Sequence, residues 1–94
     1  MIEVGVLQVT LHLQSSHSLK EKRHVVRSIK DRLRARFNIS IAEVDDQDEW
    51  QSAVLGVAFV ANDHRFVEQV LSQVKNHIDE NRDVEMIDSM QQIL

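Results

Sequence analysis

The sequence predicts an α+β fold with one antiparallel sheet. Two segments show the apolar spacing of amphipathic helices. Four others show the pattern of strands, with apolar and polar residues in alternation or many β-branched residues, and the order along the chain is β-α-β-β-α-β. At 94 residues the chain has the length of one domain, so we expect residues 1–94 to form a single unit. Hydrophobic residues make up 43% and charged residues 28%, which is typical of globular rather than disordered chains.

The first half is expected to contain a strand, a helix and a second strand. Residues 2–13 alternate, with the odd-numbered positions from 7 to 13 forming one apolar face. Ser18 and Glu21 have the spacing of a capping box, in which the serine hydroxyl accepts from the third helical N–H and the glutamate reaches back to the serine N–H. Asn38 is expected to end this helix in a left-handed conformation, and residues 39–44 form the second strand.

The second half repeats the strand, helix and strand. Residues 50–61 are apolar on both faces, which indicates a central strand. Asn62 or Asp63 is expected to cap the second helix, and residues 84–94 form a weaker strand at an edge. This order is the ferredoxin-like βαββαβ sandwich, a four-stranded antiparallel sheet with two helices on one face and the first and third strands in the centre.

Charge is unevenly distributed along the chain. The net charge is −4, yet residues 17–37 hold eight basic and two acidic residues, a net +6, which leaves −10 for the remainder. Five of the basic residues fall on one flank of the first helix at about 100° per residue: Lys20, Arg23, Arg27, Lys30 and Arg34. Two interpretations remain open, a solvated helix flank or a site for the phosphate backbone of RNA.

A second candidate surface is the sheet face away from the helices. It is expected to show small apolar side chains and one tryptophan: Val4, Val6, Trp50, Val54, Ala58 and Val60. Soluble monomers seldom expose a large apolar patch, and tryptophan is enriched at binding hot spots. We therefore expect a homo-oligomer or a protein partner on this face.

No catalytic, cofactor or metal site is predicted. The chain has no cysteine, and its five histidines do not show the i, i+4 spacing of a helical zinc site. The acidic residues 45–49 lack the glycine and spacing of a calcium loop. The loop at residues 15–18 precedes a helix but has no glycine to wrap a phosphate, and Glu21 would occupy the anion position. We expect a protein without enzymatic activity or cofactor.

The first strand carries no aromatic residue, so the base-stacking platform of some RNA-binding sheets is missing. The absence of cysteine fits a reducing compartment, and no apolar run approaches the roughly 20 residues that span a bilayer. The expectation is a cytoplasmic protein without a membrane contact.

The motif Ser18-Leu19-Lys20-Glu21-Lys22-Arg23, followed by Phe37-Asn38, Ala42-Glu43-Val44 and Leu55-Gly56-Val57, resembles the YlxP-like family of small bacterial proteins. The resemblance implies a ferredoxin-like fold and genes that often neighbour those of translation initiation and ribosome-maturation factors. It implies no established activity. Two hypotheses follow, an RNA- or ribosome-associated accessory protein that uses the first helix, or an interaction or scaffold module that uses the sheet face.

Overall fold

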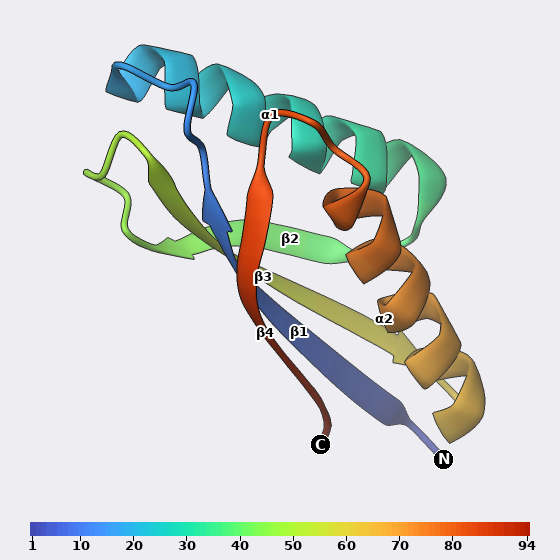
Figure 1. Ribbon diagram of the computed structural model, residues 1–94. Coiled ribbons are helices and arrows are strands. Elements are labelled where there is room, and N and C mark those ends of the chain that lie inside the picture. The colour runs from blue at the N-terminus through green and yellow to red at the C-terminus, as the bar shows by residue number, and fades with distance from the viewer.

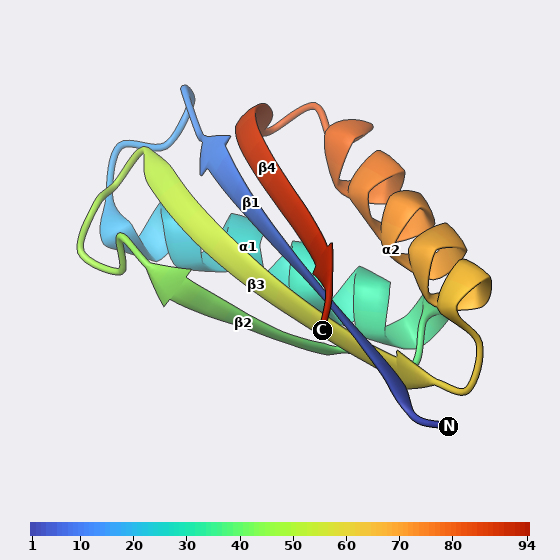
Figure 2. The same cartoon turned by 90° about the horizontal axis from the view of Figure 1, so that it is seen from below.

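The computed structural model describes all 94 residues. Its elements are β1 (Glu3–His12), α1 (Leu19–Arg36), β2 (Ser40–Asp45), β3 (Ser52–Ala61), α2 (His64–Asp79) and β4 (Glu85–Ile93). The strands form one antiparallel sheet in the order β2-β3-β1-β4. Both helices pack on the same face of the sheet and leave the other face bare (Figure 1, Figure 2). The predicted ferredoxin-like fold is confirmed, including the central positions of the first and third strands.

The core lies between this sheet and the two helices. Successive strand residues point to opposite faces, so Leu7, Val9 and Leu11 of β1 share the helical face with their β3 partners Val57 and Leu55. The apolar stripes of α1 and α2 cover them, and 17 buried side chains form one cluster. The predicted apolar face of the first strand is therefore the core face.

Gly5 allows α2 to approach β1 closely. A Cβ atom at this position would collide with Val67 and would lie 2.7 Å from Leu71 Cδ1. Both of these α2 side chains are completely buried. The glycine is needed because the helix occupies the space where any larger side chain would sit.

The helix ends differ in detail from the prediction. Ser18 Oγ accepts from the N–H of Glu21 at 3.1 Å, as predicted, but the Glu21 carboxylate accepts from the N–H of His17 at 2.5 Å rather than from that of Ser18. Asn38 does not end α1 in a left-handed conformation: the helix gives way to an extended Phe37 with φ −127°, and Asp46 is the sole non-glycine residue with positive φ. The chain turns back into β2 through residues 37–39, where the N–H of Ile39 donates to the carbonyl of Phe37 at 3.0 Å (Figure 2).

Asp63, rather than Asn62, caps α2, since its carboxylate accepts from the N–H of Phe66 at 2.9 Å. The third strand begins at Ser52, two residues later than predicted. Gln51, just before it, donates its side-chain amide to the carbonyls of Gln14 and Ser16, which joins the β2–β3 and β1–α1 loops. Neither helix is long and apolar enough to cross a membrane.

Candidate nucleic-acid interface and neighbouring surfaces

The basic flank of α1, comprising Lys20, Arg23, Arg27, Lys30 and Arg34, lies on the side of the helix that faces the β2 edge of the sheet. Arg34 places it there, since its Nη2 donates to the carbonyl of Ile41 in β2 at 3.0 Å. Arg32, on the opposite flank, lines the crevice between α1 and α2. Four of the five side chains are exposed and Lys30 is half-buried. The structure thus gathers all five predicted residues on one side of one helix.

No carboxylate forms an ion pair with the basic flank. The structure contains three ion pairs within 4.0 Å, and none includes any of these five side chains. Glu21, one of the two acids of α1, accepts the N–H of His17 at the helix start. Asp31, the other, lies on the exposed surface without an ion pair. The positive charge of the flank is therefore available to a ligand.

Lys22 does not belong to this charged surface. Its side chain is completely buried. The ammonium Nζ donates to three backbone carbonyls, those of Asp46 at 2.7 Å, Gln47 at 3.1 Å and Ser52 at 3.2 Å. Glu43 Oε2 lies 2.9 Å from Nζ but forms no aligned hydrogen bond with it, so that contact is an ion pair alone. All three ammonium protons have acceptors, as a buried charge requires.

The Lys22 ammonium holds the acidic β2–β3 loop against the first turns of α1. The same loop is closed by Ser52 Oγ, which donates to Asp46 Oδ2 at 2.7 Å, and by the left-handed Asp46 at φ 59°. The charge count of residues 17–37 included Lys22 with the other basic residues. A usable signal was its position four, seven and eleven residues before Val26, Ile29 and Leu33, which places it on the buried face of the helix.

The open face of the sheet keeps most of its predicted residues. Val4, Val6 and Ala58 are half-exposed there and Val60 is 58% exposed. Val54 also lies on this face but is only 7% exposed, so its predicted role as a contact residue is wrong. A bulge in β2 pairs Asp45 with it, while the Val44 side chain lies over Gly56, two residues further along β3.

Trp50 lies before β3 rather than within it and is 56% exposed. The sequence analysis missed Val44 and Met90, which border an open hollow of about 320 Å³ on this face. They could have been found only from the bulge of β2 and the strand order, which place them on opposite sides of Gly56.

A wider hollow of about 580 Å³ lies at the start of α1, where a phosphate-binding loop would sit. It is lined by Leu13, Ser15, Ser16, Ser18, Lys20, Glu21, His24, Val25 and Asp83. Ser16 is buried and donates its hydroxyl to the carbonyl of Ser18. The Glu21 carboxylate occupies the helix N-terminus, where an anion would bind. This arrangement favours a capped helix over a phosphate site.

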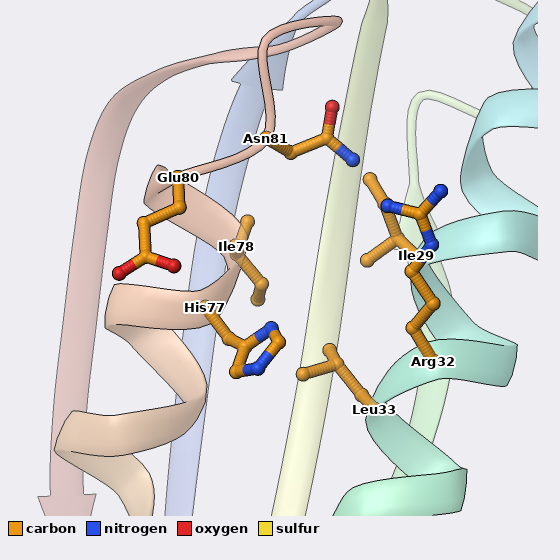
Figure 3. A pocket seen from close by; sticks show the side chains of 7 residues that line it. All are labelled: Ile29, Arg32, Leu33, His77, Ile78, Glu80 and Asn81. Carbon is orange, nitrogen blue, oxygen red and sulfur yellow. The ribbon is translucent and has the colours of Figure 1, made fainter.

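A crevice of about 200 Å³ separates α1 from the end of α2 (Figure 3). Ile29, Leu33 and Ile78 form its apolar walls, and the His77 ring points across it toward Leu33. The Arg32 guanidinium extends toward Asn81 at one end. The crevice contains no convergent set of polar groups, so we assign it to helix packing.

The histidines do not assemble into a ligand set. His64 lies 2.8 Å from Glu68 and 3.9 Å from Glu3, and the His77 ring packs edge-on against Phe37. No three histidine, aspartate or glutamate side chains gather closely enough to hold a metal ion.

Comparison with known proteins identifies the family. A family model described as "Protein of unknown function (DUF503)" matches residues 4–91. The "Uncharacterized protein YlxP" of Bacillus subtilis (strain 168) is 34% identical over 82 residues, which cover 87% of this chain and 89% of that protein. The solved structure of an amidase of the hydantoinase/carbamoylase family from Burkholderia phymatum aligns with the whole of this chain and with 28% of the amidase chain. The identity is 10% and the TM-score 0.47, which is too weak a likeness to carry an argument. The chain belongs to the DUF503 family of YlxP-like proteins, as its motifs indicated.

Proposed function

We propose that this protein is a non-enzymatic accessory protein that binds RNA, alone or within the ribosome, through the basic flank of α1. One observation carries the proposal: five cationic side chains occupy one side of a helix, without a carboxylate in ion-pair contact, in a chain of net charge −4. A row of surface cations without ion-pair partners suits an anionic partner such as a phosphate backbone. The gene neighbourhood that the family resemblance implies points the same way.

The dimensions of the basic flank suit a polyphosphate backbone. Lys20 and Arg34 are fourteen residues apart, which is about 21 Å at 1.5 Å per residue. Three of the five side chains are arginines, whose planar guanidinium can donate two hydrogen bonds to one phosphate. Five such contacts predict a slope of about −3.5 for single-stranded RNA in a plot of log K against log salt, and about −4.5 for a duplex.

The rest of the molecule orients this contact. Outside residues 17–37 the chain carries a net −10, which disfavours RNA binding by the rest of the protein. The sheet offers no stacking platform, since β1 has no aromatic residue and Phe59 of β3 is buried in the core. Recognition therefore rests on backbone and shape rather than on base stacking.

Two triple variants with equal charge change test the proposal. Lys20→Glu, Arg23→Glu and Arg27→Glu reverse three exposed cations of the flank. Arg65→Glu, Lys75→Glu and Arg82→Glu reverse the three basic residues outside residues 17–37. Each triple lowers the net charge by six, so the two proteins differ only in where the charge is lost.

Binding is measured with single-stranded RNA, duplex RNA and purified ribosomes over a series of salt concentrations. The flank triple is expected to lose at least tenfold in affinity, and about 2.1 units of salt slope with single-stranded RNA or about 2.7 with a duplex, while the control triple keeps most of its affinity. Equal losses in both variants would show general electrostatics rather than a site. An unchanged affinity in the flank triple would exclude the proposal.

A further inference from the structure

The outer edge of β4 is an unpaired strand edge. β4 is the last strand in the order β2-β3-β1-β4 and pairs only with β1 (Figure 2). The Leu94 N–H donates to the Val4 carbonyl of β1 at 2.8 Å. Because the backbone groups of successive residues alternate between the two sides of a strand, those of Ser89, Gln91 and Ile93 point away from the sheet. These groups can pair with a strand of another molecule.

The β4 edge lacks the features that protect the β2 edge. Natural sheets blunt an exposed edge with a short strand, charges, prolines or a bulge. β2 has six residues, among them Glu43 and Asp45 with a bulge between them, and Arg34 donates to its Ile41 carbonyl. β4 has nine residues, and its register shift lies near its start. Residues 89–94 include neither a charged residue nor a proline.

The residues along the β4 edge are symmetric in polarity about Met90. From Met86 to Leu94 they read apolar, apolar, polar, polar, apolar, polar, polar, apolar, apolar. In an antiparallel pair with a second copy, centred on Met90, each side chain therefore meets one of its own kind. The residues opposite each other are Met86 and Leu94, Ile87 and Ile93, Asp88 and Gln92, Ser89 and Gln91, and the two copies of Met90.

The neighbouring registers do not match in this way. Only residues whose backbone groups point outward can exchange hydrogen bonds, so a two-fold axis must pass beside a residue rather than between two residues. An axis at Ser89 would set Asp88 opposite Met90, and an axis at Gln91 would set Ser89 opposite Ile93. An axis at Asp88 would set two carboxylates opposite each other, which is destabilising. The register about Met90 is therefore favoured.

The charges of α2 beside this edge are complementary in the same register. Ile87 borders one hollow between β4 and α2, and Ile93 borders another hollow near the start of α2. A two-fold axis at Met90 sets the first hollow of each copy beside the second hollow of the other. The residues brought toward each other are Lys75 and the partner's Glu68, and Asp79 and the partner's His64.

We propose that two copies of this chain join their β4 edges in antiparallel register about Met90, so that the two four-stranded sheets become one. Each of the two pairs of Ser89 with Gln91 exchanges two backbone hydrogen bonds. The two Met90 side chains, each 48% exposed in the single chain, meet on the open face. The interface forms without RNA, because the basic flank of α1 lies toward the β2 edge and stays exposed in both copies. A single pair of strands is a small interface, so we expect a reversible dimer.

Sedimentation at tens of micromolar protein, without nucleic acid, tests the interface. The parent chain is expected to be a dimer. Gln91→Pro removes an outward N–H but no hydrogen bond within the chain, and Met90→Lys sets two ammonium groups opposite each other. Both variants are expected to be monomers with the circular dichroism of the parent.

Val60→Lys is the matched control for Met90→Lys. Val60 is 58% exposed on the same face but lies two strands away from the β4 edge, so this variant is expected to remain dimeric. A monomeric parent, or a dimer that survives both edge substitutions, would overturn the proposal. Loss of the dimer in Val60→Lys would indicate association through the open face and would also overturn it.

Disulfide trapping tests the register, since the chain has no native cysteine. Opposite residues of a non-hydrogen-bonded pair have Cα atoms about 4.5 Å apart, within reach of a disulfide. Met90→Cys is therefore expected to oxidise to a covalent dimer. The two copies of Gln92 would lie about 14 Å apart, too far for a disulfide. Gln92→Cys is expected to stay unlinked alone and to form a mixed dimer with Asp88→Cys. Efficient linking of Gln92→Cys to itself would contradict the register about Met90.

Discussion

Replacing Lys22 with methionine removes one buried charge and retains most of the side-chain volume. The change leaves the Glu43 carboxylate, whose side chain is 16% exposed, without its cation. It also leaves the carbonyls of Asp46, Gln47 and Ser52 without their donor. Breaking a buried ion pair from one side typically costs about 3–5 kcal/mol. A domain of this size has only about 5–14 kcal/mol of stability in total, so the loss should be a large fraction of it.

Urea unfolding followed by two signals measures this loss. Far-ultraviolet circular dichroism reports the whole fold, and the fluorescence of Trp50, the only tryptophan, reports the loop that Lys22 holds. The variant is expected to unfold at lower urea with the slope little changed. A Trp50 transition that precedes the circular dichroism transition would show that the loop detaches first.

A second substitution separates the two sources of the loss. Adding Glu43→Gln to Lys22→Met removes the unpaired carboxylate but not the unpaired carbonyls. The double variant should recover part of the stability, with about 1–3 kcal/mol still missing. If Lys22→Met alone loses less than about 1 kcal/mol, the ammonium does not stabilise the loop as the geometry indicates, and the reasoning is wrong.

Three further substitutions test the packing and capping. Gly5→Ala should lose about 1–3 kcal/mol of unfolding free energy because the new methyl group collides with α2, whereas Gly56→Ala, facing the exposed Val44, should lose less. Ser18→Ala should lose about 1 kcal/mol, since the hydroxyl caps α1; an equal loss from Ser15→Ala, an exposed serine outside the helix, would refute this role. Val54→Asp should lose more than about 2 kcal/mol, because the carboxylate would be buried without a partner, while Val60→Asp should lose less than about 1 kcal/mol. Chemical denaturation measures all of them, and equal losses at positions 54 and 60 would contradict the burial difference.

Several features followed directly from local sequence patterns. The alternation of residues 2–13 and the two-sided apolar pattern of residues 50–61 predicted the central strands, because side chains in a strand alternate between faces. The spacing of Ser18 and Glu21 predicted the start of α1, since capping depends on residues three positions apart. The helical period predicted that the five basic residues lie on one side of α1, because it depends only on the spacing of residues along the chain.

Other predictions failed because they depended on contacts between distant parts of the chain. Val54 is covered since β2 contains a bulge, and nothing near position 54 encodes it. Asn38 was expected to end α1 in a left-handed conformation, but the chain turns back into β2 through an extended Phe37 and a hydrogen bond from the Ile39 N–H to the Phe37 carbonyl.

Lys22 shows most clearly which features follow from the sequence and which depend on the tertiary structure. The sequence by itself determined that this residue lies on the apolar side of an amphipathic helix, since the spacing to Val26, Ile29 and Leu33 depends only on the helical period. Whether its charge reaches solvent depended on Glu43 and on the carbonyls of a loop 24 to 30 residues away. A charge can be buried only where acceptors converge on it, and only the tertiary structure brings those acceptors together.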